Sequence, residues 1–201
     1  MTDSKNKNSF SQLPDGFKNI YTLNLQKDKK TAVIVNVLSL LIFVAFAVAG
    51  AYFAYVNNMI LFSVDSLASM LLKLGVMLGG TIIYLVLHEA VHGVVMKYYG
   101  AKKIKYGFTG LYAFAGCDGY FKRKPYIVIA LAPIVLWGII LAVVCVFVPR
   151  DWFWVVYFIQ LANLSGAAGD IYVSYKFLRL PNDILIRDTG IEMTVYSAVS
   201  C

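Results

Sequence analysis

The chain has 201 residues, of which 60% are hydrophobic and 14% are charged. Soluble domains are about a quarter charged, so this composition excludes an ordinary soluble domain and favours a membrane protein. The formal net charge of +7 would suit a nucleic-acid-binding protein, but the basic residues cluster in a few segments, which favours membrane topology instead. The three cysteines share no CxxC spacing, which indicates neither a disulfide framework nor a thiolate metal site.

A polar N-terminal segment, residues 1–31, precedes an apolar stretch at 32–56 that contains no charged residue. About 20 apolar residues span a bilayer, so this stretch predicts a first transmembrane helix. It begins far from the N-terminus and is longer than the core of a signal peptide. We therefore expect it to stay in the membrane as an anchor.

The second apolar stretch, 67–99, contains the HExxH motif HEAVH. Residues four apart in a helix differ by about 40° around its axis, so His88 and His92 project from one face and can chelate one zinc ion. Glu89 can then take a proton from a zinc-bound water. The chain has only two histidines and two glutamates, and three of these four residues lie here. The alternative without a function is a polar cluster that faces a water-filled cavity. Each charged side chain near the bilayer centre costs about 2–3 kcal/mol, however, which argues against charged residues that have no role.

Residues 100–125 do not have a helical pattern. Apolar and basic residues alternate at their start, which places Ile104, Tyr106 and Phe108 on one side of a strand. Asp118–Gly119 is a typical hairpin-turn dipeptide. We predict a small hairpin or sheet at the cytoplasmic membrane surface. It could pair with an extended substrate strand, or it could be a basic loop resting on anionic lipid.

Two further apolar stretches, 126–148 and 152–177, complete four predicted transmembrane helices. The fold class is therefore an all-α polytopic membrane protein with a small cytoplasmic β element between helices two and three. We expect one membrane domain over residues 1–201. The tail, 178–201, is too polar to span a membrane and could form a short strand pair, with Arg187 and Asp188 as a solvated surface pair.

Basic residues follow the positive-inside rule. Six lysines lie in residues 1–30, and seven basic residues lie in 97–125 against one aspartate, whereas the other two loops are nearly free of basic residues. This places the N-terminus, the 100–125 loop and the tail on the cytoplasmic side of the cell membrane. An even number of crossings agrees with both termini lying on one side.

A third protein ligand is needed for a catalytic zinc, and a carboxylate is the next choice after histidine. Asp170 is the one aspartate inside a predicted membrane helix. Lys97 follows His92 by five residues, and Lys176 follows Asp170 by six, so both positions lie at similar depth in helices that run the same way. We predict that Asp170 is the third ligand. Its alternative role is a buried partner for a polar group of another helix.

Asn163 lies two helical turns before Asp170 and about 20° away, on the same face. It could bind the substrate backbone or an oxyanion. It could equally form an interhelical hydrogen bond, a common role for asparagine in membrane helices.

A helix with HExxH, followed by a membrane helix with Asn163 and then Asp170, resembles the site-2 protease family of intramembrane metalloproteases. That family has NPxxxxxLDG in the second element, whereas this chain lacks the proline and the glycine, and its Asn–Asp spacing is one residue shorter. The chain is more similar, over nearly its whole length, to the bacterial zincin peptidase family of small four-helix proteins, long known as a domain of unknown function. The segments that carry this resemblance are LPDGFKNI, LNLQKDKK, HEAVHG, ALAP, SGAAGD and LRLPNDILIRDTG. The resemblance implies metal ligation and identifies no substrate.

We predict a zinc metallopeptidase with one zinc per chain, held by His88, His92 and Asp170, and with Glu89 as general base. Its expected partners are membrane-protein or peptide substrates and the lipid bilayer, with no nucleic acid. One alternative is a non-catalytic zinc-binding scaffold, which would not need Glu89 and would favour a closed, cysteine-rich site. A metal transporter is less favoured, because the intramembrane charges lie at one depth, Lys73 aside. The sequence does not indicate an oligomeric state.

Overall fold

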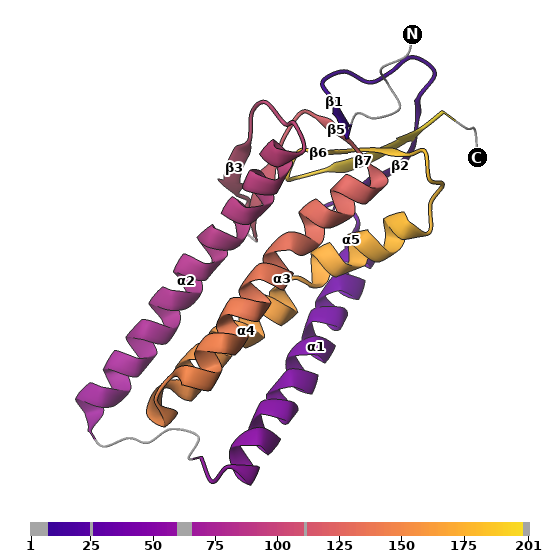
Figure 1. The fold of residues 1–201 in the computed structure, drawn as a ribbon. Helices are drawn as coiled ribbons and strands as arrows, with labels where there is room; N and C mark the ends of the chain where they lie inside the picture. Colours follow the sequence, from indigo (N-terminus) through magenta and orange to yellow (C-terminus); the bar gives the residue numbers. More distant parts are fainter. Residues whose placement is uncertain (1–7, 25, 60–65, 111, 199–201) are drawn as a thin grey trace. The chain divides into compact units, whose positions relative to one another are not determined.

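The computed structural model describes residues 8–24, 26–59, 66–110 and 112–198. This part of the chain is mostly helical and has two small antiparallel sheets (Figure 1). The helices are α1 (Lys29–Val56), α2 (Leu67–Tyr98), α3 (Arg123–Phe147), the 3-10 helix η1 (Arg150–Trp152), α4 (Phe153–Gly166) and α5 (Ala168–Leu178). The strands are β1 (Ser9–Phe10), β2 (Lys18–Leu23), β3 (Lys105–Phe108), β4 (Ala113–Gly116), β5 (Tyr120–Lys122), β6 (Leu185–Asp188) and β7 (Met193–Ser197). Asp65, between the first two predicted spans, and Cys201, in the predicted tail, lie outside the described residues.

Three of the described helices, α1, α2 and α3, are long and apolar enough to cross a membrane. They cover the first three predicted spans. Large apolar side chains lie exposed along them, for example Leu41, Ile82 and Ile139. A continuous apolar surface of this kind needs lipid or protein to cover it. Helix α1 begins three residues earlier than predicted, because Asp28 caps it by accepting a hydrogen bond from the Thr31 N–H at 3.1 Å.

The fourth predicted span, 152–177, is not one continuous helix. It consists of α4 and α5, which meet at Ala167. Gly166 precedes this interruption and Gly169 follows it. Each glycine lowers helix stability by about 1 kcal/mol relative to alanine, which favours a break in this segment. As a result Asp170 lies in the first turn of a new helix, where a negative charge is favourable.

The larger sheet has five antiparallel strands in the order β1-β5-β6-β7-β2. The predicted strand pair in the tail is confirmed as β6–β7, whereas β1 and β2 in the N-terminal segment were not predicted. The sheet contributes Phe121, Ile186 and Val195, each fully buried, to an apolar core that also holds Met96 of α2 and Phe177 of α5. The sheet therefore packs on the ends of the helices that follow the HEAVH segment and Asp170.

The predicted hairpin is confirmed as β3–β4, but its turn is not the predicted one. The reversal lies at Thr109–Tyr112, where the Thr109 N–H donates to the Tyr112 carbonyl at 3.0 Å. Asp118–Gly119 instead joins β4 to β5, which belong to different sheets. The reason is that β5 pairs with β1 and β6 and not with β4. The Asp118 carboxylate lies 2.7 Å from Lys105 and 2.8 Å from Arg187.

Internal contacts divide the chain into two compact units. One unit comprises Met1–Val33, Glu89–Pro133 and Asp170–Cys201, and it holds both sheets. The other comprises Ile34–His88 and Ile134–Gly169, and its secondary structure is helical in the residues that the structure describes. The single membrane domain expected from the sequence stays a prediction.

Candidate metal centre

Helix α2 carries His88 and His92 on successive turns, with Glu89 next to His88, as the sequence predicts. The potential ligand atoms of these three residues all lie within 4.8 Å of one another. Both histidines are buried, and Glu89 is partly exposed. His88 and His92 can therefore converge on one ion, because residues four apart share a helix face, and Glu89 lies beside them.

His92 is held through its Nδ1 atom, which lies 2.9 Å from the carbonyl oxygen of Ile129 in α3. A carbonyl only accepts hydrogen bonds, so we assign the ring proton to Nδ1. The lone pair of the imidazole is then on Nε2. This is the arrangement that a metal-binding histidine commonly has.

His88 is held in a similar way through a tyrosine. Its Nδ1 atom lies 2.9 Å from the Tyr84 hydroxyl, which donates to Oδ1 of Asn163 at 3.1 Å. Because Tyr84 uses its proton on Asn163, its oxygen accepts from Nδ1 of His88, and again the lone pair is on Nε2. Tyr84 was missed in the sequence analysis. Its position one turn before His88 is the only signal that could have identified it.

Asn163 is fully buried between polar groups of its own unit. Besides accepting from Tyr84, it donates from Nδ2 to Oε1 of Gln160 at 3.2 Å and lies 3.5 Å from the Ile134 carbonyl. The structure therefore places it in an interhelical hydrogen-bond network. The predicted contact with substrate stays a prediction.

Asp170 lies beside His92, as the depth comparison predicts. Its Oδ1 is 3.6 Å from Nε2 of His92. Two ligands on a tetrahedral zinc, each about 2.1 Å from the ion, lie about 3.4 Å apart. The separation in the structure fits an imidazole nitrogen and a carboxylate oxygen around a shared cation, and the donor set of two imidazoles and a carboxylate suits zinc.

Asp188 is not the solvated partner of Arg187 that the sequence suggested. Strand β6 turns its carboxylate into the protein, where it accepts hydrogen bonds from the Tyr126 hydroxyl at 2.6 Å and the Gly190 N–H at 2.8 Å. Arg187 pairs with Asp118 instead. Burial raises the pKa of Asp188 above its ordinary value, although its hydrogen bonds act in the opposite direction. No local sequence signal distinguishes this aspartate from a surface one.

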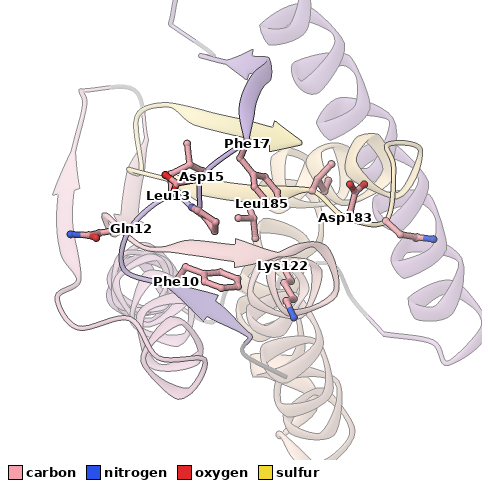
Figure 2. Close-up of a pocket in the computed structure, with 11 residues that line it drawn as sticks. Phe10, Gln12, Leu13, Asp15, Phe17, Lys122, Asp183 and Leu185 are labelled. Atoms are coloured by element: carbon pink, nitrogen blue, oxygen red, sulfur yellow. The ribbon is translucent and has the colours of Figure 1, made fainter. Parts of the chain in front are cut away.

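A pocket of about 710 Å³ lies apart from these residues, against the larger sheet (Figure 2). Apolar side chains such as Phe10, Phe17 and Leu185 line it together with Lys122 and Asp183. None of the predicted metal or catalytic residues contributes to its lining. The pocket is therefore a feature separate from the metal centre.

The profile of one protein family, described as "Putative zincin peptidase", matches residues 81–185, more than half of the chain. The chain belongs to this family. The match includes the HEAVH segment, Asn163 and Asp170, so the zincin peptidase family covers every residue discussed as a ligand. Membership points to a zinc metallopeptidase. No curated protein and no solved structure gave a match.

Proposed function

We propose that this zincin peptidase is a membrane-embedded metalloendopeptidase that binds one zinc through His88, His92 and Asp170. The observation that carries the proposal is the orientation of the two imidazoles, each held at Nδ1 with its Nε2 lone pair suited to a metal. The 3.6 Å separation of Asp170 from His92 supports the third ligand.

Glu89 is the proposed general base. A zinc bound beside it supplies Lewis-acid chemistry, lowering the pKa of a water and polarising a peptide carbonyl. Glu89 accepts the proton of the attacking water and delivers it to the leaving amine nitrogen, so that the peptide bond breaks without net proton uptake. The partial exposure of Glu89 between two buried histidines leaves it accessible to substrate.

We further propose that α4 and α5 together make a fourth membrane crossing, interrupted at Ala167. Irregular backbone is tolerated at membrane depth where it lies against protein or lines a cavity, and the carboxylate of Asp170 follows directly. With four crossings, the distribution of basic residues puts both termini in the cytoplasm. The substrates in this reading are membrane proteins or peptides that reach the zinc near the cytoplasmic surface.

Metal analysis of the purified protein tests the proposal directly. Wild type, His88→Ala and Asp170→Ala are compared by elemental mass spectrometry in detergent, with Asp118→Ala as a control acid far from the motif in the sequence and paired with Lys105 and Arg187. We expect about one zinc per chain in the wild type and the control, and loss of zinc in both ligand variants. Zinc retained in Asp170→Ala would exclude Asp170 as a ligand, and a wild type that stays free of zinc when zinc is supplied would exclude the peptidase.

A further inference from the structure

Tyr106 of β3 packs directly on α2 one residue after His92. A Cβ atom built on Gly93 would lie 2.0 Å from the Tyr106 hydroxyl oxygen and 2.7 Å from its Cζ. Only glycine at position 93 lets the ring approach this closely. Gly75 and Gly79, earlier in the same helix, have no atom within 4 Å of the equivalent position. Close contact is therefore not general along α2, although a Cβ on Gly80 would also lie 2.8 Å from Cδ1 of Ile159.

The contact lies on the Glu89 side of α2. Gly93 follows Glu89 by four residues, so the two positions differ by about 40° around the helix and about 6 Å along it. The Tyr106 hydroxyl, resting on Gly93, is consequently one helical turn from the proposed general base. Figure 1 shows β3 beside the end of α2 that follows the motif.

The β3–β4 hairpin that carries Tyr106 also packs against the turn between β6 and β7. Strand β4 packs on the turn between β6 and β7, where a Cβ on Gly190 would lie 2.0 Å from the Phe114 ring and one on Gly116 would lie 2.2 Å from the Thr189 backbone. The Cys117 N–H donates to the Asp188 carbonyl at 2.8 Å. These contacts hold the hairpin in place, so the position of Tyr106 is set by the fold.

Tyr106 is 55% exposed, and its hydroxyl has no hydrogen-bond partner among the residues that the structure describes. Strand β3 pairs with β4 on one side, and all four of its residues are exposed. The Tyr106 hydroxyl can therefore donate a hydrogen bond to a peptide that lies along the Glu89 face of α2. An extended peptide rises about 3.3 Å per residue. The rise of about 6 Å along α2 between Glu89 and Gly93 therefore corresponds to about two residues of a bound peptide.

We propose that Tyr106 is a substrate-binding residue, whose hydroxyl donates a hydrogen bond to a peptide carbonyl about two residues from the bond that is cleaved. This assignment rests on the proposed peptidase function. Gly93 acts as its positioning residue, because it sets how close the phenol comes to Glu89. The substrate chemistry is an extended polypeptide backbone, recognised by its carbonyl rather than by a side chain.

The test measures peptide binding separately from cleavage. Zinc-loaded Glu89→Gln protein in lipid nanodiscs is titrated into a fluorescein-labelled decapeptide of alternating alanine and leucine, followed by fluorescence anisotropy. The same titration is made with Tyr106→Phe, Gly93→Ala and Gly79→Ala added singly. We expect Tyr106→Phe to raise Kd about fivefold to tenfold, the loss of one hydrogen bond, and Gly93→Ala to raise it at least as much. Gly79→Ala, with open space around its new methyl group, should leave Kd unchanged.

Unchanged Kd in Tyr106→Phe, or no peptide binding even with Tyr106 intact, overturns the assignment. Tyr106→Phe keeps the ring and its packing, so a folding defect does not confuse the result. Cleavage of the same peptide by protein with intact Glu89 tests the proposed function itself. Tyr106-dependent binding without any cleavage would overturn the proposed peptidase function but not the contact between Tyr106 and the peptide. Cleavage with the same kcat and KM in wild type and Tyr106→Phe would support the peptidase function and overturn the role of Tyr106.

Discussion

Tyr126 donates a 2.6 Å hydrogen bond to Asp188, and both residues are buried. The bond ties strand β6 of the tail to the first turn of α3. One turn further along α3, the Ile129 carbonyl lies 2.9 Å from Nδ1 of His92. The orientation of a proposed zinc ligand therefore depends on a helix whose start is anchored by a residue close to the end of the described chain.

Replacing Asp188 by alanine should destabilise the protein, because the buried Tyr126 hydroxyl and the partly buried Gly190 N–H lose their acceptor. Two such losses cost about 2–4 kcal/mol of unfolding free energy. Unfolding in a graded SDS titration measures this. Asp188→Asn can still accept from Tyr126 and should recover part of the loss. Equal stability of wild type and Asp188→Ala would show that the bond contributes nothing.

Removing the Tyr84 hydroxyl should weaken zinc binding without removing a ligand. Tyr84→Phe keeps the ring but breaks the link between His88 and Asn163. Loss of such an orienting partner typically lowers metal affinity about 10–100-fold. Competition with a chromophoric chelator gives the affinity. The matched control is Tyr157→Phe, whose hydroxyl donates to the Phe46 carbonyl at 2.6 Å; its zinc affinity should not change. Equal effects of the two variants would contradict a role specific to His88.

Glu89→Gln should separate metal binding from catalysis. The variant keeps the size of the side chain and both histidines, so its zinc content should equal that of the wild type. Loss of a general base lowers the rate by about 10²–10⁴-fold. Hydrolysis of the decapeptide by zinc-loaded protein, followed by mass spectrometry, gives the rate. Cleavage at the wild-type rate would exclude Glu89 as the base while leaving the zinc site in place.

The ion pairs of Asp118 predict an acid-dependent loosening of the hairpin. Hydrogen bonds from Lys105 and then from Arg187 hold the pKa of Asp118 below its ordinary value of 3.8. Because the folded pKa is the lower one, the stabilisation is complete above pH 3.8 and is lost as the pH falls through the folded value. In Lys105→Ala the pKa should rise toward 3.8, measured by carboxyl carbon NMR in micelles. Lys103→Ala, which removes a neighbouring exposed lysine, should leave it unchanged.

The sequence predicts well those features that depend on nearby residues. Apolar length identifies α1, α2 and α3, and the spacing of His88 and His92 fixes their shared face. Asp170 could be identified as a candidate ligand because placing a lone carboxylate in an apolar membrane segment has a high free-energy cost. In contrast, the burial of Asp188 depends on β6 pairing with β5 and β7 from distant parts of the chain. The break at Ala167 is likewise hidden, because its small residues equally suit close packing of one helix on another.

The strand order β1-β5-β6-β7-β2 also has a consequence for biosynthesis. Strand β2 is translated before α1, yet its one neighbour in the sheet is β7, which the ribosome makes after α5. The helices α1 to α5 are therefore made while β2 has no β7 strand to pair with. Asp188, the anchor of α3, arrives with the same late segment. The Ile129 carbonyl that orients His92 therefore lies on a helix that is not anchored until β6 has been made.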